Sequence, residues 1–312
     1  MSSRLTLRGR GLALAALALC TTTVTAYAAT EPARGAAESQ AASVSISGAA
    51  DAKQVRFGRR VRISGALTSR TVGATVRLEH RPRGGGFRGV AQTRTGADGS
   101  YRFRPVARRS GSYRAVSEGA AASAARRVTV VGAVQARATR HVLGGRAVRA
   151  RGTVMPRKRG RGVRLQLRTR SGWRTVDRTR TGRGGRFSAS WRPGAAGVYR
   201  LRVRSSGDRF AAATADRLAR VRTYRPGYAS WYGPGLYGNR MACGGTLTTS
   251  TLGVAHKSLP CGTRVTFRYR GRSVTVPVVD RGPFVSGREW DLTSATKNRL
   301  GFGSTGTVWS TR

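Results

Sequence analysis

The carboxylate side chains in the last part of the chain all lie in one short stretch. Between Tyr224 and Arg312 the only acidic residues are Asp280, Glu289 and Asp291, within the stretch DRGPFVSGREWDL. Carboxyl groups serve as general acids and bases when burial or a neighbouring charge shifts their pKa. Two carboxyls that lie together can shift one another's pKa in this way. The stretch is therefore where we expect any acid–base chemistry of this chain.

Each of these acids also has a purely structural interpretation. Asp280 beside Arg281 is either a catalytic group or a partner in an ion pair or turn. Asp291 precedes a predicted helix, whose N-terminus favours the ionised carboxylate, so it is either catalytic or only a helix-start residue. Burial beside its apolar neighbours would act in the opposite direction on its pKa. Glu289 is interpreted as a solvated surface charge.

Three further side chains in this segment can contribute to a binding site. His256, the sole histidine here, either hydrogen-bonds a loop or lines a groove, where it would bind a ligand or orient a carboxylate. Trp231 and Tyr232 either stack on a sugar ring or pack in a core, since aromatic rings serve both purposes.

The cysteines indicate a cross-link rather than a metal site. Loss of a cleaved N-terminal segment would remove Cys20 and leave Cys243 and Cys261. An even pair in an exported chain predicts one disulfide, with two free thiols as the alternative. Two thiols with one nearby histidine cannot complete a structural zinc site. We therefore expect neither a metal nor another cofactor.

The first 28 residues have the composition of a secretory signal peptide. They combine three arginines, the apolar run GLALAALALC and a small-x-small pattern at Ala26–Ala28, which predicts cleavage near Ala29. The run is too short to span a bilayer as a permanent helix, although an uncleaved anchor remains an alternative. Lipidation of Cys20 is disfavoured by Leu19. The prediction is a secreted, extracellular or cell-wall-associated protein without an integral membrane segment after cleavage.

The chain has an extreme positive charge. Its formal net charge is +47, and 55 of the 59 basic residues are arginine. Such a charge favours association with polyanions at low salt, which for an exported protein are anionic wall polymers and lipid headgroups. GC-rich coding can account for part of the arginine bias. Because the charge is spread evenly and no nucleic-acid-binding module is present, we expect no specific nucleic-acid partner.

Ahead of the acidic stretch the chain repeats itself. Residues 29–43 are small and polar and predict a disordered lead-in. The sequence TRTGADGSY then matches TRTGRGGRF at an offset of 86 residues. This predicts two copies of one fold, over residues 44–131 and 134–222. Segments such as VRLEH and VRLQL alternate apolar and basic residues, so each copy is predicted to be a small β-sandwich.

These repeats resemble the Ig-like repeats of bacterial surface proteins, in which an aromatic residue follows a glycine turn. Neither copy groups histidine, cysteine or carboxylate side chains, and His80 and His141 are each isolated. We interpret the repeats as a spacer or adhesive stalk rather than as a catalytic unit.

The elements that must position the acids are predicted in residues 224–312. Thr263–Tyr269 and Arg272–Val279 alternate cleanly around a short turn and predict a hairpin. Thr293–Gly301 begins with a capping hydroxyl and ends with glycine, which predicts one short helix. The sequence TGTVWST predicts a final strand. The segment is therefore expected to be a compact β structure with one or two short helices.

Three motifs of this segment resemble the rare-lipoprotein-A family of septal-ring lytic transglycosylases. They are ASWYGPGLYGNRMACGG, GVAHKSLPCGTRV and VVDRGPFVSGREWDLTSATKNRLGFGSTGTV, in that order. The family fold is a six-stranded double-psi β-barrel, shared with expansins and the membrane-bound lytic transglycosylase A group. The latter group pairs two aspartates eleven residues apart, as Asp280 and Asp291 are here.

The resemblance implies a function as well as a fold. It implies an all-β chain in which two Ig-like sandwiches precede a six-stranded double-psi barrel. It places His256, Asp280 and Asp291 in a polar groove, with Asp291 as acid/base and Asp280 assisting. The implied reaction is non-hydrolytic cleavage of peptidoglycan glycan strands, which leaves 1,6-anhydro-muramyl ends. The alternative is a non-catalytic glycan-binding or wall-loosening module of expansin type.

Two departures from the family pattern bear on this choice. Gly245 and Thr248 stand where many family members have acidic groove residues. Cys243 and Cys261 stand where many have serine and phenylalanine. A disulfide between these cysteines would pin the loop before GVAHK to the following strand and stabilise a small exported domain.

Overall fold

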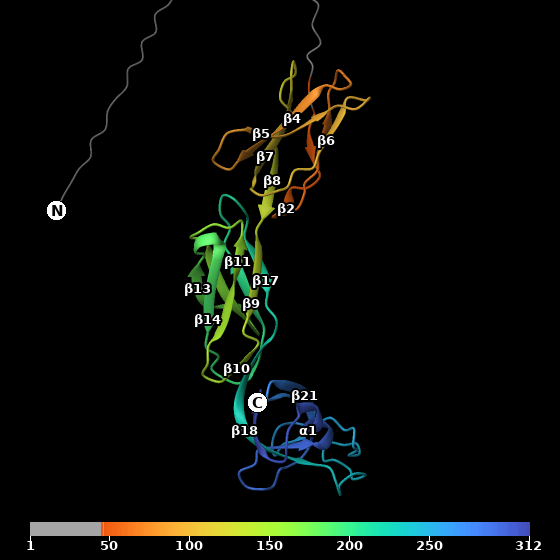
Figure 1. The fold of residues 1–312 in the computed structure, drawn as a ribbon, viewed down its shortest axis with the longest axis vertical. Helices are drawn as coiled ribbons and strands as arrows, with labels where there is room; N and C mark the ends of the chain where they lie inside the picture. Colours follow the sequence, from red (N-terminus) through yellow and green to blue (C-terminus); the bar gives the residue numbers. More distant parts are fainter. Residues whose placement is uncertain (1–44, 46) are drawn as a thin grey trace, which may run out of the picture. The chain divides into compact units, whose positions relative to one another are not determined.

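A computed structural model describes residue 45 and residues 47–312 (Figure 1). The predicted signal peptide over residues 1–28 and lead-in over residues 29–43 lie outside the described residues. Within the described part the chain is built of strands, with one α-helix, α1 (Ser294–Leu300), and one 3-10 turn, η1 (Arg183–Gly185). None of its helices is long and apolar enough to cross a membrane. The predicted all-β class is confirmed.

The first repeat consists of two sheets that share one core. One sheet has the order β1-β3-β6 and the other has the order β2-β8-β7-β4-β5. The strands are β1 (Ala49–Ala50), β2 (Gln54–Arg56), β3 (Ile63–Ala66), β4 (Thr75–Pro82), β5 (Arg88–Arg94), β6 (Ser100–Phe103), β7 (Gly111–Ser117) and β8 (Arg126–Val131). Ile63 and Phe103 of the first sheet pack in one cluster with Val76 and Leu78 of the second. The repeat is therefore a β-sandwich.

The second repeat has the same design. Its sheets have the orders β14-β11-β9 and β13-β12-β16-β17. The strands are β9 (Ala133–Ala138), β11 (Val148–Met155), β12 (Gly162–Thr169), β13 (Gly172–Arg180), β14 (Arg186–Trp191), β16 (Leu201–Ser205) and β17 (Thr214–Arg217). Val163, Leu165 and Leu167 of β12 are buried between the sheets, whereas Arg164 and Arg168 are exposed. The alternation seen in the sequence thus sets the inner and outer faces of this sheet.

The last six strands close into a barrel (Figure 1). Their order is β18-β22-β19-β21-β20-β23, and β23 pairs again with β18. The strands are β18 (Val221–Tyr232), β19 (Val254–Ala255), β20 (Arg264–Tyr269), β21 (Arg272–Asp280), β22 (Trp290–Thr293) and β23 (Gly306–Ser310). The interior is filled by apolar side chains, among which Trp290, Phe267 and Leu292 are fully buried. Closure pairs every strand on both sides and so leaves no open edge.

Strand β18 belongs to two sheets. Its first residues pair with β10 (His141–Leu143) and β15 (Gly197–Tyr199) of the second repeat. From Arg225 onward it pairs with β23 and then with β22 of the barrel. The passage from sandwich to barrel therefore occurs within one continuous strand rather than through a linker.

Local sequence signals account for the hairpin and the helix of the barrel. The β20–β21 hairpin turns at Arg270 and Gly271, which both have positive φ values of 43° and 85°. Helix α1 is capped by the Thr293 side chain, which accepts a hydrogen bond from the Thr296 amide. It ends at Gly301, whose φ of 66° is left-handed and favours glycine. Both predicted elements are confirmed.

The predicted disulfide is present. Cys243 and Cys261 are bonded, with 5.5 Å between their Cα atoms and 18 residues between them in sequence. The bond joins the long loop that follows β18 to the segment that leads into β20. The Cys243 amide also donates to the carbonyl of Val279 on β21, at 3.2 Å. The loop is therefore fixed against the strand that ends in Asp280.

Removal of this cross-link should destabilise the barrel without changing its fold. In the double variant Cys243→Ala, Cys261→Ala the unfolded chain regains the entropy of an open loop, which lowers the free energy of unfolding by about 3 kcal/mol. Denaturant unfolding without reductant measures this difference. Wild type unfolded with reductant is the matched control and should lose a similar amount. Equal stability of the oxidised wild type and the variant would contradict the role assigned to the bond.

Candidate active site

Strand register places the two aspartates of the acidic stretch around a single residue. Ala255 of β19 pairs with Asp291 of β22 on one side and with Asp280 of β21 on the other. Directly paired residues project from the same face of a sheet, and two strand spacings separate their Cα atoms by about 10 Å. A register irregularity lies at this point, between Val254 and Ala255. The closed barrel thus gathers both carboxyls on one part of its wall.

Asp291 is a half-buried carboxyl with one hydrogen-bond donor. Ser230 on the parallel strand β18 lies in register with it and donates its hydroxyl to Asp291 Oδ1 at 2.8 Å. Burial raises the pKa of Asp291 above its ordinary value, although the Ser230 hydrogen bond and the Arg288 charge oppose this, and the Asp280 charge adds to it. Asp291 lies in β22, ahead of the helix cap at Thr293. Burial is the largest of these effects on the pKa of Asp291.

Asp280 is held by backbone amides. Its Oδ1 accepts from the amides of Ala242 at 2.8 Å and Arg281 at 2.9 Å. The Arg281 guanidinium is directed elsewhere, toward the Leu259 carbonyl at 2.9 Å and the Cys261 sulfur at 3.4 Å. No ion pair joins the two side chains in the described part of the chain. The ion-pair interpretation of Asp280 is therefore wrong, and its carboxylate depends on the disulfide-bonded loop.

The hydrogen bonds of His256 determine its tautomer. Its Nδ1 accepts from the amides of Ser258 at 3.1 Å and Leu259 at 3.0 Å. Because both partners are donors, the ring proton of neutral His256 is on Nε2. Burial lowers the pKa of His256, opposed by the Glu289 charge and reinforced by nearby cations. The ring is thus a neutral imidazole whose Nε2–H can donate. Its own amide donates to the Asp280 carbonyl at 3.1 Å.

The two predicted aromatic residues lie on opposite faces of β18. Tyr232 is on the Ser230 face, and its hydroxyl is buried. Burial raises the pKa of Tyr232, and the charge of Asp280, a side-chain contact with its carboxyl and the charge of Asp291 raise it further, so the phenol lies close to both carboxyls. Alternation directs Trp231 the other way, where it packs against the barrel core with Lys297 Nζ 4.1 Å from its ring centroid. The structure therefore brings only Tyr232 to the acidic site.

The remaining acid and the substituted groove positions contribute no carboxylate to this site. Glu289 is not a free surface charge as predicted, because it forms a bidentate ion pair with Arg225 that includes an Nη1–Oε2 bond of 2.8 Å. Gly245 is exposed with a φ of 76°. The Thr248 hydroxyl lies 2.9 Å from that of Thr251 in its own loop. The acid–base capacity of the site rests on Asp280 and Asp291.

The sequence alone does not indicate Ser230. It directly contacts a carboxyl, but a serine in a strand carries no signal of its own. The available clue was alternation, since a serine two residues before Tyr232 on a strand must face the same side. Its partner could not be found without the register between β18 and β22.

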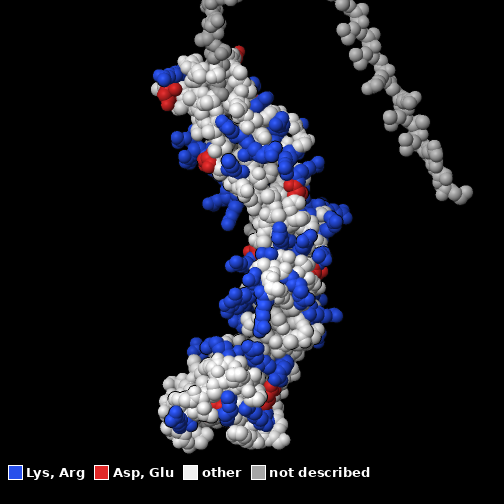
Figure 2. All heavy atoms as spheres, turned by 180° about the vertical axis from the view of Figure 1, so that it is seen from behind, with Lys and Arg blue, Asp and Glu red and all other residues white. Residues whose placement is uncertain are grey.

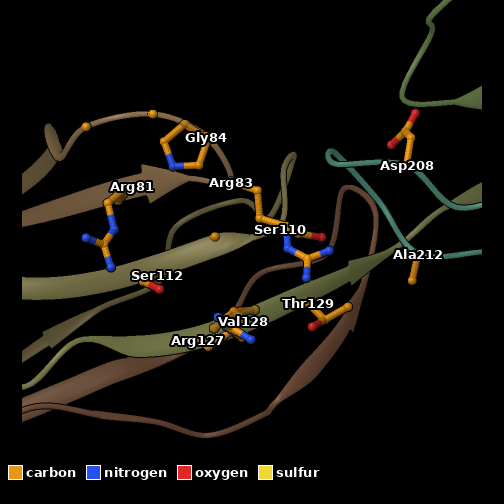
Figure 3. Close-up of a pocket in the computed structure, with 14 residues that line it drawn as sticks. Arg81, Arg83, Gly84, Ser110, Ser112, Arg127, Val128, Thr129, Asp208 and Ala212 are labelled. Atoms are coloured by element: carbon orange, nitrogen blue, oxygen red, sulfur yellow. The ribbon is translucent and has the colours of Figure 1, made fainter. Parts of the chain in front are cut away.

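One cavity of the described residues is lined by side chains of the two repeats and so lies away from the barrel (Figure 3). It has a volume of about 950 Å³ and is lined by Arg81, Arg83 and Arg127 among others. Its one carboxylate, Asp208, is engaged by Arg161 at 2.6 Å. Paired acids are thus lacking in this cavity. No cluster of three or more histidine, cysteine or acidic residues suited to a metal ion occurs in the part of the chain described here.

Fold and site together define a double-psi β-barrel with two aspartates on its wall, and comparison with known proteins agrees. Residues 224–309 match the family described as lytic transglycolase. The resemblance found in the sequence is confirmed for this domain.

Curated relatives match part of this chain. One is the "Probable endolytic peptidoglycan transglycosylase RlpA" of Synechocystis sp., 43% identical over 95 residues, which cover 30% of this chain and 30% of that protein. Another is the "Endolytic peptidoglycan transglycosylase RlpA" of Pseudomonas aeruginosa strain UCBPP-PA14, 46% identical over 91 residues, 28% of this chain and 27% of that protein. The match thus spans under a third of either relative.

Among solved structures, a tetra-tandem repeat from the extending region of a large adhesion protein aligns with 79% of this chain and 66% of its own, at 15% identity and a TM-score of 0.33. The sandwich assignment of the repeats rests on their own sheets and cores.

The raised pKa of Asp291 predicts a pH-dependent stability difference. Between its unfolded pKa of about 3.9 and its higher folded pKa, the folded state binds more protons, so wild-type stability falls as pH rises through this window. Relative to wild type, Asp291→Asn should therefore gain stability as pH rises from about 4 to 7. Denaturant unfolding at a series of pH values measures this trend.

Asp208 provides a control of opposite sign. Burial raises the pKa of Asp208, but hydrogen bonds from Arg161 and from backbone amides outweigh it and lower the pKa overall. Asp208→Asn should therefore lose stability relative to wild type as pH rises through the region from its lowered folded pKa to just above its ordinary pKa of about 3.9. Parallel trends for the two variants would contradict the raised pKa of Asp291.

Proposed function

We propose that the barrel is a lytic transglycosylase that cleaves peptidoglycan glycan strands without water. The observation that carries the proposal is Asp291, a half-buried carboxyl whose pKa is raised by burial and which lies on the same wall as Asp280. A raised pKa keeps a larger fraction of the carboxyl protonated, as a general acid requires. The match to the lytic transglycolase family and the names of the curated relatives support the substrate class.

One carboxyl suffices for this reaction. Protonated Asp291 donates its proton to the glycosidic oxygen between a muramyl and a glucosaminyl residue as that bond breaks. The resulting carboxylate then accepts the proton of the muramyl 6-hydroxyl, whose oxygen closes the 1,6-anhydro ring. Because this internal hydroxyl replaces water as the nucleophile, no second base is mandatory. The absence of acids at Gly245 and Thr248 is therefore compatible with catalysis.

The other residues of the site have supporting roles in this proposal. Asp280, fixed by two amides, stabilises positive charge that develops on the sugar ring. His256 donates from Nε2 to a sugar hydroxyl. Tyr232 places a buried hydroxyl beside both carboxyls. Trp231, with Lys297 against its ring, is a proposed sugar contact only through the remaining exposed part of its side chain.

The proposed setting is the cell wall. Residues 1–28 are proposed to direct export, and the two repeats, interpreted as Ig-like, act as a spacer that carries the barrel. The disulfide suits an oxidising compartment. The arginine-rich repeats are proposed to contact anionic wall polymers, which is a separate binding function from that of the barrel.

A non-catalytic glycan-binding or wall-loosening module is the second candidate. The observation that favours it is the lack of carboxylates at the two substituted groove positions, Gly245 and Thr248. Such a module would sediment with insoluble wall material but would release no new glycan ends.

Asp291→Asn tests the proposed acid. The amide cannot donate a proton to the leaving oxygen, so glycan release from purified peptidoglycan should fall by about 10²-fold or more, while sedimentation with the wall is retained. Ser250→Ala, in an exposed loop, is the control and should keep wild-type activity. Undiminished release by Asp291→Asn would exclude Asp291 as the acid.

Ser230→Ala tests the same assignment through pH dependence. The Ser230 hydroxyl lowers the pKa of Asp291, so its removal should raise that pKa further. Since the acid must be protonated, activity falls as pH rises through this pKa, and in Ser230→Ala the fall should occur at higher pH. A pH–rate profile of kcat measures the shift. An unchanged or lower midpoint would contradict the proposal.

A further inference from the structure

The second repeat carries a sheet face covered with arginine. Along the strands β13-β12-β16-β17, the outward positions form what we call the arginine face. Its members are Arg164, Arg168, Arg178, Arg202, Arg204 and Arg217, together with Gln166 and Trp173. Figure 2 shows how strongly Lys and Arg outnumber Asp and Glu on one side of the molecule. The arginine face differs from that general excess because its arginines occupy paired positions on neighbouring strands.

Like charges stand directly opposite one another on this face. Arg164 pairs with Arg178 on one side and with Arg204 on the other. Arg202 pairs with Arg217. Like charges opposite one another on adjacent strands destabilise a sheet. Burial and the charges of Arg204, Arg168 and Arg217 lower the pKa of Arg202. The arrangement is therefore unfavourable for folding and calls for a compensating partner.

The carboxylates of these strands do not supply the compensation. Asp177 accepts a hydrogen bond from the Ser190 amide of the other sheet at 2.7 Å. Asp216 pairs with the core residue Val203 and so faces the other side of β17. Asp208, the remaining acid of the repeat, is paired with Arg161. The arginine face has no counter-charge of its own among the described residues.

The first repeat has an equivalent arginine, but there a carboxylate on the neighbouring strand neutralises its charge. There Arg114 pairs with Glu79 in register, and Arg114 Nε lies 2.7 Å from Glu79 Oε2. In the second repeat Arg202 pairs with Gln166, and Arg202 Nε donates to Gln166 Oε1 at 2.8 Å. A neutral amide thus occupies the place of the carboxylate. The Arg202 guanidinium is therefore held by a hydrogen bond, as in the first repeat, but no carboxylate neutralises its charge.

Both repeats hold this guanidinium against an aromatic ring. The Arg114 guanidinium carbon lies 4.0 Å from the centroid of Phe87. That of Arg202 lies 4.3 Å from the centroid of Trp173, with Arg168 at 5.7 Å. Stacking on an aromatic ring orients a guanidinium while leaving its N–H groups free to donate. The arginine face is therefore pre-organised for acceptors.

A cavity opens beside this ring within the second repeat. It has a volume of about 420 Å³ and is lined by Arg168, Trp173, Arg200, Leu201, Arg217, Leu218 and Arg220. Four of these residues are arginines and none is an acid. An isolated positive pocket of this kind is suited to a phosphate group, which arginine binds with two parallel hydrogen bonds.

We propose that the arginine face of the second repeat binds successive phosphate groups of a linear phosphodiester polymer of the wall. Outward residues two apart on a strand, such as Arg202 and Arg204, are about 6.6 Å apart, a spacing that an extended phosphodiester chain can follow. The choice of a wall polymer rests on the proposed function, which places the chain at peptidoglycan.

Two observations favour such a polymer over other anions. Nucleic-acid strands gain affinity by stacking bases on aromatic side chains, but Trp173 is partly buried with guanidinium groups over its ring. Membrane surfaces are bound by faces that insert apolar side chains, and no large exposed apolar side chain belongs to the arginine face. A charged face that neither stacks bases nor inserts apolar side chains into a membrane fits a polymer of phosphates and small polyols.

The test is the binding of poly(glycerol phosphate) to the full chain, measured by calorimetry over a range of salt concentrations. Arg202→Gln with Arg217→Gln should weaken binding about tenfold or more, since charge-assisted hydrogen bonds are lost. The slope of log K against log salt should also fall by about one to two. The control, Arg149→Gln with Arg151→Gln, removes the same charge from exposed positions of the other sheet. It should change affinity by less than about twofold.

A single substitution keeps the test decisive if the double variant does not fold. Gln166→Glu recreates the neutralising pair of the first repeat and should weaken binding, whereas Arg149→Gln, with the same change in net charge, should not. Equal losses in site and control variants would show that only net charge matters and would overturn the proposal. Tighter binding to single-stranded DNA of equal charge, or to anionic lipid vesicles, would overturn the proposed occupant. Glycan cleavage is not measured, so failure here leaves the barrel proposal intact.

Discussion

The site depends on one register, the pairing of Ala255 with Asp291 on one side and Asp280 on the other. Closure of the barrel fixes this register, because β19 has a partner strand on each side and cannot slip without breaking both ladders. A shift of one residue would turn one carboxyl to the opposite face. Buried hydrogen bonds between Gly253 and the hydroxyls of Thr293 and Thr296 hold the same strands to helix α1. The scaffold is thus most constrained where the acids lie.

The two carboxyls are treated differently by this scaffold. Asp291 is half-buried with one hydroxyl donor and has a raised pKa, which favours the protonated form. Asp280 instead accepts hydrogen bonds from two backbone amides. The two carboxyls thus have different surroundings, which is consistent with the different roles proposed for them. The disulfide contributes to this difference, because the loop that it secures supplies the Ala242 amide.

Much of the architecture could be read from local sequence signals. Alternation in the strands, the hydroxyl and glycine caps of α1 and the turn at Arg270–Gly271 each depend on neighbouring residues, so they were predictable. Contacts that depend on the pairing of strands far apart in the sequence were not predictable. The Ser230–Asp291 bond joins residues 61 apart in sequence, and the direction of Trp231 away from the acids follows from the register of β18. The alternative of an ion pair between Asp280 and Arg281 is wrong because the guanidinium donates to carbonyls on a distant loop instead.

The central claim is that the barrel cleaves glycan strands by internal attack, with Asp291 as acid and then base. The most direct measurement is digestion of purified peptidoglycan in water enriched in heavy oxygen, followed by mass spectrometry of the released ends. Internal attack predicts 1,6-anhydro-muramyl ends without heavy oxygen. Reducing ends that contain heavy oxygen would show hydrolysis instead, and the absence of any new ends would show that the barrel binds glycan without cleaving it.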